Sequence, residues 1–369
     1  MKKWVKIILG VFGGLLGLLL VAAGGYIAYM QANYYRIEDE TLLETENNRQ
    51  EKADSSKTFT IATYNIGFGA YEPDYTFFMD TGKMKDGTPT QGKHSRALSE
   101  ENCRRNTEGS IALLQSLNCD FYFVQEADEK ATRSYSIDQV NMIRNAMASY
   151  GSVFTNAFHT PYLMYPLTEP HGSVESGLVT LSRYQIGANT RYQLPVSTAF
   201  ITKFTDLDRC FTASRLELEN GRSLVLVNLH LSAYDEGGTI RQQQMERLRS
   251  FLAEEYEKGN YVIAGGDFNH DIAGTISQFP SEQEIPEWVY QLSDKDLPSG
   301  FSFVIPDNVS EVPSCRGADI PYKKGVDYTV TVDGFLVSAN ITASSRVIEN
   351  EFAYSDHQPV VMTFTLKEN

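Results

Sequence analysis

Residues 261–269 read YVIAGGDFN, a short apolar run that ends in two glycines and then reaches Asp267 and Asn269. A run this short and this apolar predicts a strand that is buried on both faces of a sheet. A carboxylate at the end of a buried strand is costly unless it has a partner or a chemical task. Asp267 and Asn269 are therefore candidate functional residues, and an Asx turn after the glycine pair is the structural alternative.

The same arrangement recurs along the chain. Polar side chains also stand at the ends of other apolar runs, at Asn65 in TYNIG, Glu126 in FYFVQE, His230 in LVNLHL, Asp333 in TVDGFLVS, and Asp356 with His357 in YSDHQPV. Taken singly, each has a structural explanation, such as a turn for an asparagine or a satisfied core position for a lone histidine. Together they are the residue types that a phosphoester hydrolase with a hard cation requires, because Mg²⁺ prefers oxygen ligands and imidazoles transfer protons.

Short β-rich runs alternate with helical stretches over the same part of the chain. The predicted strands are 59–66, 121–125, 177–181, 211–218, 224–231, 261–264 and 333–338, and the predicted helices are 99–117, 138–149 and 240–258. The last helix has Thr239 as its predicted N-cap and Gly259 as its terminator. Because strands and helices interleave, the sequence predicts an α/β or α+β sandwich.

The chain has 369 residues, of which 42% are hydrophobic and 21% charged. This composition excludes a wholly disordered, a collagen-like or a polytopic membrane protein. The formal charge is −15, and it becomes −18 when Lys2, Lys3 and Lys6 are set aside, because 29 basic side chains then face 47 acidic ones. A surface this acidic argues against broad binding along a nucleic-acid backbone, but it allows a small basic site or a bound divalent cation.

Four cysteines are scattered along the chain without any Cys-x-x-Cys spacing, at Cys103, Cys119, Cys210 and Cys315. This pattern indicates neither a structural zinc site nor a disulfide scaffold, so cysteine chemistry is not expected at the centre of the function. Whether any two of them form a disulfide stays open, since the sequence alone cannot pair them.

The N-terminal region is apolar. Residues 7–30 are 24 consecutive uncharged positions, which at about 1.5 Å per residue of helix can cross a hydrocarbon layer of roughly 30 Å. The apolar region of a cleaved signal peptide is usually shorter, so an uncleaved transmembrane anchor is favoured. Lys2, Lys3 and Lys6 precede the span, and the positive-inside rule then places residues 1–6 in the cytoplasm and the rest of the chain outside.

The remaining sequence divides into two parts. Residues 31–57 are polar and acidic, which predicts a tether between the membrane and a folded body. The body covers residues 58–369 and has no internal repeat or second linker, so a single domain is expected. Inside it, residues 67–105 and 150–172 are rich in aromatic and basic side chains, and we interpret them as long connections that either grip the substrate or lie at the surface.

The order of the motifs resembles that of the endonuclease/exonuclease/phosphatase superfamily, which includes the DNase I-like nucleases. TYNIG, VQE, GLVTLSRY, VNLHL, GGDFN, VDGFLVS and SDHQPV follow one another from Asn65 to His357, and GDFN followed by SDH is the most specific part. The resemblance implies a four-layered α/β (α+β) sandwich, in which two packed, mostly antiparallel sheets are flanked by helices.

The resemblance also implies a metal site and a catalytic group. Mg²⁺, for which Mn²⁺ can substitute, would be held by Asn65, Glu126 and Asp356. The residues with a catalytic role would be His230, Asp267, Asn269, Asp333, His357 and Glu175. In this scheme Asp267 is the base, and Asn269 and His230 contact the phosphate or transfer protons. Asp333 holds His357, while Glu175 supports His230.

These features together predict an exported, membrane-anchored, Mg²⁺-dependent phosphoesterase that hydrolyses phosphodiesters. A nuclease is the leading interpretation by resemblance, and a phosphodiesterase or phosphatase acting on phospholipid or sphingomyelin is the alternative of the same fold. A non-catalytic binding module is the alternative from another class, although every expected catalytic position is occupied. The substrate would be a nucleic acid or a phospholipid headgroup, the N-terminal helix would contact the membrane, and no obligate protein partner is expected.

Overall fold

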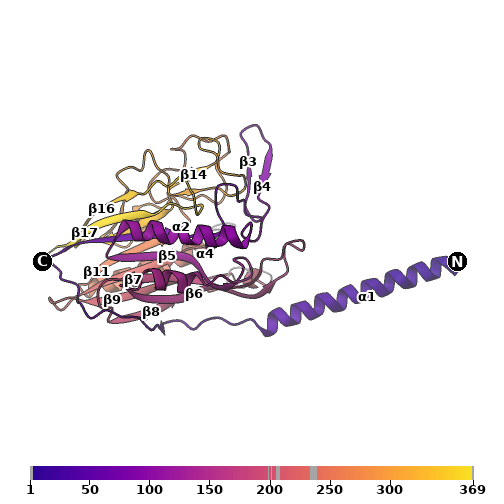
Figure 1. Cartoon of the computed structure of the whole chain (residues 1–369), viewed down its shortest axis with the longest axis horizontal. Helices are drawn as coiled ribbons and strands as arrows, with labels where there is room; N and C mark the ends of the chain where they lie inside the picture. The colour runs from indigo at the N-terminus through magenta and orange to yellow at the C-terminus, as the bar shows by residue number, and fades with distance from the viewer. Residues whose placement is uncertain (1–2, 198, 201, 205–207, 233–238, 368–369) are drawn as a thin grey trace.

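The computed structural model describes residues 3–197, 199–200, 202–204, 208–232 and 239–367. Two β-sheets form the body, and a long helix, α1, extends away from it (Figure 1). The predicted cytoplasmic segment 1–6 and the predicted domain 58–369 both include residues outside the described part, so their outer boundaries stay predictions.

The larger sheet has seven strands in the order β1-β8-β9-β10-β11-β15-β12. Their bounds are β1 (Thr41–Leu42), β8 (Ala188–Gln193), β9 (Cys210–Glu217), β10 (Ser223–His230), β11 (Tyr261–Asp267), β15 (Asp333–Ser338) and β12 (Phe301–Val304). Only β10 and β11 are parallel among these described strands, and the other neighbours are antiparallel.

The second sheet has six strands in the order β16-β17-β2-β5-β7-β6. Their bounds are β16 (Ile341–Val347), β17 (Val360–Leu366), β2 (Thr58–Asn65), β5 (Phe121–Ala131), β7 (Gly172–Ser182) and β6 (Gly151–Leu163). The neighbours β2 and β5 are parallel. Short ribbons and 3₁₀ turns complete the body, namely β3 (Thr81–Lys83) with β4 (Pro89–Gln91), β13 (Cys315–Arg316) with β14 (Thr329–Val330), η1 (Gly67–Gly69), η2 (Thr202–Phe204) and η3 (Asp294–Asp296).

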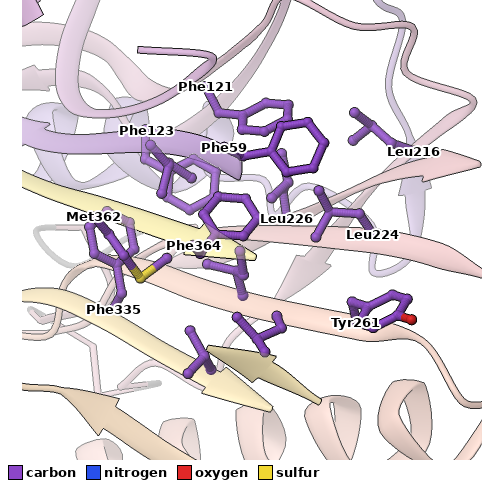
Figure 2. Close-up of a cluster of buried hydrophobic side chains, with 14 of the residues drawn as sticks. Phe59, Phe121, Phe123, Leu216, Leu224, Leu226, Tyr261, Phe335, Met362 and Phe364 are labelled. Atoms are coloured by element: carbon purple, nitrogen blue, oxygen red, sulfur yellow. The ribbon is translucent and has the colours of Figure 1, made fainter. Parts of the chain in front are cut away.

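The two sheets pack face to face through a core of large apolar side chains. Figure 2 shows Phe59, Phe121 and Phe364 from the six-stranded sheet meeting Leu224 and Leu226 from the seven-stranded sheet. A second apolar cluster lies between β10, β11 and helix α4 (Thr239–Glu257), and a third lies between β2, β5 and helices α2 (Glu100–Leu117) and α3 (Gln139–Ala146). The predicted four-layered sandwich of two mostly antiparallel sheets flanked by helices is therefore confirmed.

Local chemistry explains where the helices begin and end. The side chain of Ser99 accepts a hydrogen bond from the backbone N–H of Asn102 and caps α2, and Asp138 caps α3 through the N–H of Asn141. The helix α2 ends at Asn118, which adopts the left-handed conformation with φ +50°. The predicted helices 99–117, 138–149 and 240–258 thus agree with the structure to within a few residues.

The N-terminal helix α1 (Lys3–Ala32) contains the predicted span 7–30. Among the described residues it is the helix that is long and apolar enough to cross a membrane, and its apolar window is not buried by the body. Figure 1 shows it projecting from the body, with the C-terminus of the chain on the far side.

The segment that follows α1 differs from the predicted tether. Strand β1 pairs with β8, Glu46 forms a β-bridge with Ser152, and Ala53 is buried in the core between the sheets. A tether that holds the body away from the bilayer over residues 31–57 is therefore wrong for most of this segment. The segment has few apolar side chains, which is why the sequence predicted a tether. Backbone and polar side-chain hydrogen bonds attach the segment to the sheet edge instead.

The predicted connection 150–172 is also wrong over most of its length. Residues 151–163 form strand β6, the edge of the six-stranded sheet, and pair with β7. Only the turn between these two strands connects elements, and it holds residues of the catalytic cleft described below.

Candidate active site

Strand register brings three of the predicted residues into one row. Parallel pairing of β10 with β11 sets His230 beside Asp267, and antiparallel pairing of β11 with β15 sets Asp267 beside Asp333. Gly266 adopts φ +144° where β11 approaches β10, and a Cβ atom there would lie 2.0 Å from the carbonyl oxygen of Leu229. Glycine at this position therefore lets β11 deliver Asp267 to the sheet edge.

The six-stranded sheet brings a second pair to the same place. Asn65, at the end of β2, is the register partner of Gln125 on β5. The register of β5 against β7 then shifts between Val124 and Ala127, and Glu126 inside this bulge has φ +53°. Bulges re-aim side chains, so this one accounts for the direction of Glu126 into the cleft rather than across the sheet.

Asn65 joins the two sheets. Its Nδ2 donates to Asp267 Oδ2 at 3.0 Å and to Glu126 Oε1 at 3.2 Å, while its Oδ1 accepts from the backbone N–H of Gly67 at 2.9 Å. The structure thus uses the Asn65 amide to orient two carboxylates. Its side-chain oxygen accepts one hydrogen bond and keeps a second lone pair that is open to a metal ion.

His357 and Asp333 form a buried pair. His357 Nδ1 donates to Asp333 Oδ2 at 2.8 Å, and the same oxygen accepts from Ser314 Oγ at 2.7 Å. Burial alone would lower the pKa of His357, but the Asp333 carboxylate raises that pKa well above its ordinary value. His357 is therefore a cation, and its Nε2 lies 3.6 Å from Asp267 Oδ2.

His230, in contrast to His357, is neutral. Its Nε2 lies 3.3 Å from Asp267 Oδ2 and 4.0 Å from Glu126 Oε1. Burial lowers the pKa of His230 well below its ordinary value, and the positive charges of Arg209 and His357 lower it further. The two imidazoles thus flank one carboxylate oxygen as a neutral ring and a charged ring.

Asp267 is the centre of the group. Burial raises the pKa of Asp267 to about 7, against the lowering effect of His357. The backbone N–H of Asn269 donates to Asp267 Oδ1 at 2.8 Å, and the Asn269 side chain donates to the carbonyl of Leu231 at 2.8 Å. A carboxylate with this pKa can accept a proton near neutral pH, which is what a general base must do.

Glu126 and Asp356 form an acidic pair that suits a divalent cation. Burial raises the pKa of Asp356 to about 6, and the charge of Glu126 contributes to the rise. Among the described residues, neither carboxylate forms an ion pair with a lysine or arginine. Two carboxylates that lie together without a lysine or arginine ion pair fit an oxygen-preferring metal ion. Asp267, Asp333 and His357 also bring ligand atoms within 4.8 Å of one another, but His357 and Asp333 are bonded to each other.

Glu126, His230, Asp267, Asp356 and His357 line a cleft of about 390 Å³, and Asn65 and Asp333 lie behind them, hydrogen-bonded to Asp267 and His357. We call Asn65, Glu126, His230, Asp267, Asp333, Asp356 and His357 the floor. The side of the cleft is made of packed rings, which we call the wall and which comprise Phe68, Tyr71, Phe77, Phe78, Phe158 and His171. No lysine lines the cleft among the residues that the structure describes.

Glu175 stands outside this group. It lies on the exposed face of β7, opposite Lys130 and His159, and no contact with His230 occurs in the described part of the chain. The residues that line the cleft from this strand are Ser176, Gly177 and Leu178.

Several residues at the site were not predicted. Cys315 Sγ lies 3.7 Å from His357 Nε2, and burial raises the pKa of this thiol to about 12, so it remains neutral. The Arg316 guanidinium donates to the carbonyls of Glu72 at 3.1 Å and Gly317 at 2.8 Å and so fixes the wall. Ser314 orients Asp333. The only sequence signal for these three is their position shortly before the VDGFLVS run.

Comparisons with known proteins agree with this geometry. Over residues 62–357 the chain matches the model of the endonuclease/exonuclease/phosphatase family. It is similar in structure to an endonuclease/exonuclease/phosphatase from Beutenbergia cavernae DSM 12333, with 16% identity and a TM-score of 0.55 over 84% of this chain and 72% of that one. It is also similar to an endonuclease/exonuclease/phosphatase family protein from Leptotrichia buccalis C-1013-b, with 13% identity and a TM-score of 0.53 over 84% of this chain and 100% of that one.

TDP2 from Caenorhabditis elegans has the same fold, with 13% identity and a TM-score of 0.52 over 84% of this chain and 74% of that one. At such identities the likeness shows a shared fold. The comparison with curated protein sequences gives no match.

Proposed function

The chain belongs to the endonuclease/exonuclease/phosphatase family of phosphoester hydrolases, and we propose that it is a divalent-metal-dependent phosphodiesterase held at a membrane by α1. The observation that carries this proposal is the meeting of Asn65, His230 and His357 around the Oδ2 atom of Asp267. A base whose pKa is near neutral, beside one charged and one neutral imidazole, suits attack of water on a phosphodiester.

The residues of the floor have different roles in the reaction. Asp267 takes a proton from the attacking water, and Asn65 holds the carboxylate in place for this transfer. The charged His357, fixed by Asp333, donates a hydrogen bond from Nε2 to a phosphoryl oxygen that gains negative charge. The neutral His230 donates a second hydrogen bond from the other side of Asp267. The bond from the water oxygen to phosphorus forms as the bond to the leaving oxygen breaks, and solvent supplies the proton that this oxygen takes up.

Glu126 and Asp356 would hold the metal ion. Mg²⁺ is the proposed ion, with Mn²⁺ as a substitute, because both ligands are hard oxygen donors. When bound, such an ion neutralises phosphate charge and polarises the phosphoryl group. Asn65 would add its side-chain oxygen, which keeps a lone pair beside the hydrogen bond from Gly67, while its Nδ2 orients the carboxylate of Glu126.

The cellular arrangement is part of the proposal. The positive side chains before the uncharged span 7–30 favour a cytoplasmic N-terminus, which leaves the catalytic body on the outer side of the membrane. Nuclease action is the substrate class that the family resemblance favours, and a phospholipid headgroup is the second. A binding module without catalysis is disfavoured by the complete floor.

Hydrolysis of bis-(p-nitrophenyl) phosphate by the full chain in detergent tests the reaction. We expect turnover with Mg²⁺ or Mn²⁺ that EDTA abolishes and that His230→Ala lowers strongly. Glu175→Gln is the matched control, because Glu175 is an exposed acid near the cleft but outside the floor, and this variant should behave as wild type. Equal rates for wild type and His230→Ala would favour the binding module, and a large loss with Glu175→Gln would restore the role that the resemblance gave to this residue.

A further inference from the structure

Near its C-terminal end, α1 contacts the body beside the cleft. Tyr26 Oη donates to the carbonyl of Tyr162 at 3.0 Å and accepts from the N–H of Met164 at 3.2 Å. Tyr26 lies four residues before Met30, where the uncharged run ends, so it is about 6 Å from the end of the membrane-crossing stretch. Tyrosines at this depth occupy the boundary between lipid and water. Residues 162–164 therefore lie at that boundary as well.

The turn that follows is apolar and exposed. Met164, Tyr165 and Leu167 are 44%, 67% and 79% exposed, and residues 160–168 carry no charged side chain. We call residues 163–167 the lip. Hydrogen bonds from the N–H of His171 to the Tyr165 carbonyl at 3.2 Å and from Arg96 Nε to the Pro170 carbonyl at 2.6 Å hold the turn in shape. Large apolar side chains fixed in an exposed position are typical of a surface that meets a membrane or a partner.

The lip is continuous with the catalytic cleft. Leu163 and Tyr165 line the same cavity as Asp267 and His357. A series of ring contacts runs from the lip to the floor, with centroid distances of 5.6 Å for Tyr165–Phe78, 4.9 Å for Phe78–Phe77, 5.9 Å for Phe77–Tyr71 and 5.4 Å for Tyr71–Phe68. An apolar path thus connects the membrane boundary with the catalytic residues.

The charges of the cleft disfavour a polyanion. Three arginines line the cleft, Arg133, Arg209 and Arg316, against the five acidic side chains of Asp80, Glu126, Asp267, Asp319 and Asp356. Arg133 is paired with Asp128 through bonds of 2.9 and 3.1 Å, and Arg316 donates to backbone carbonyls. Stacking of single-stranded nucleic acid on aromatic rings normally goes with a positively charged groove that follows the backbone. A lipid presents one phosphodiester and an apolar body, which matches one catalytic floor and one aromatic wall.

We propose that the substrate is a phospholipid phosphodiester that enters the cleft from the membrane leaflet facing the body, with the lip inserted among the lipids. This inference rests on the proposed phosphodiesterase function and specifies its substrate class. Water adds to the lipid phosphorus, one phosphorus–oxygen ester bond breaks, and the products are a phosphomonoester and an alcohol. The proton of the water passes to Asp267, and the released alkoxide takes a proton from solvent.

The first experiment uses the full chain reconstituted into vesicles of phosphatidylcholine, phosphatidylethanolamine and phosphatidylglycerol. We expect wild type to hydrolyse the lipid phosphodiester at least tenfold faster than single- or double-stranded DNA or RNA oligonucleotides at equal phosphodiester concentration. Faster hydrolysis of an oligonucleotide overturns the proposal in favour of a nuclease. Hydrolysis of bis-(p-nitrophenyl) phosphate without lipid hydrolysis overturns the proposal and leaves the phosphodiesterase function intact. Failure with all of these substrates refutes both.

The lip is tested with Met164→Asp combined with Leu167→Asp. The ratio of lipid hydrolysis to bis-(p-nitrophenyl) phosphate hydrolysis should fall at least tenfold, because charged side chains no longer enter the membrane boundary. Leu42→Asp is the matched control, since Leu42 is an 80% exposed leucine on β1 and away from the cleft. Its ratio should stay within twofold of wild type, and an unchanged ratio in the lip variant contradicts the proposal.

Fluorescence quenching by lipids tests the position of the lip at the membrane without a measurement of catalysis. All four native cysteines are buried, so a fluorophore can be attached selectively to Leu167→Cys or to the control Leu42→Cys. In the reconstituted vesicles, lipids that carry a nitroxide near the headgroup should quench the probe at position 167 and leave the probe at position 42 bright. Equal quenching at both positions would show that the lip does not face the lipids.

Discussion

The floor and the wall of one cleft differ in how the fold positions them. Three floor residues, His230, Asp267 and Asp333, stand at strand ends and are neighbours because β10, β11 and β15 pair in one alignment. The wall residues come mostly from connections, with Phe158 on β6, and they are held by ring packing and by the buried Arg133, whose guanidinium lies 3.9 Å from the Phe68 ring centroid. Changes in the floor should therefore remove chemistry while the fold persists, and changes in the wall should alter stability and substrate preference.

Asp267→Asn should have the largest effect. The amide keeps the shape of the side chain but cannot accept a proton from water, so the turnover number for bis-(p-nitrophenyl) phosphate at saturating metal should fall by roughly 10³-fold or more. The fold should persist because asparagine fills the same volume, although its NH2 group loses the hydrogen bond from either Asn65 Nδ2 or the N–H of Asn269. If the variant unfolds, or keeps a tenth of the wild-type rate, the expectation that a change in the floor removes chemistry and leaves the fold intact is wrong.

His357→Ala should follow, with a loss of roughly 10²-fold in the turnover number, since a fixed cation no longer faces the phosphoryl oxygen. Asp333→Asn should give a smaller loss than His357→Ala, because the ring remains but loses the carboxylate that keeps it charged. The two rates, measured side by side at pH 7, check this order. A greater loss from Asp333→Asn would mean that Asp333 acts beyond holding His357.

Glu126→Gln should change the metal requirement more than the chemistry. Removal of one charged ligand should raise the metal concentration for half-maximal rate about tenfold, with partial recovery of the rate at high metal. Titration with Mg²⁺ and Mn²⁺ measures this shift. If the titration is the same as for wild type, Glu126 does not bind the ion, and the acidic pair with Asp356 needs another explanation.

The floor was largely predictable from the sequence, for a reason that lies in the strands. The strands β2, β10 and β11 are nearly continuous apolar runs because both of their faces are buried, and this composition identifies them without structural information. Polar residues at the ends of such runs are easy to recognise. Parallel pairing of two strands then brings their C-terminal ends together. Asn65, His230 and Asp267 were recognised in this way.

The remaining features depend on contacts between distant residues. The bulge that directs Glu126 and the hydrogen bonds of the Asn65 amide cannot be read from single segments. Strand β6 was interpreted as a connection because Asn156 and His159 interrupt its apolar pattern, and only pairing with β7 makes it a strand. The position of the lip at the membrane boundary depends on the hydrogen bond of Tyr26 to Tyr162, which joins distant parts of the chain.

His171 gives the smallest and most specific test of the wall. Burial, together with Arg133 and Arg96, lowers the pKa of His171 to about 3, and its Nδ1 donates to the Ser95 carbonyl at 2.7 Å. The folded protein thus keeps this ring neutral where the unfolded chain, with a pKa of about 6.5, binds a proton. The stability that His171 contributes is fully present above about pH 6.5 and is lost as pH falls toward 3. Between pH 7 and pH 6 this loss is roughly 0.7 kcal/mol.

His171→Phe should remove that dependence, because phenylalanine keeps a ring in the wall and does not titrate. The free energy of unfolding of the full chain in detergent can be measured with urea at pH 7 and at pH 6. From pH 7 to pH 6 it should fall by roughly 0.7 kcal/mol less in the variant than in wild type. An equal fall in both proteins would mean that His171 is protonated in the folded state. In that case a positive charge, rather than a neutral ring, would stand between the lip and the floor, and the apolar path proposed for the lipid would be interrupted.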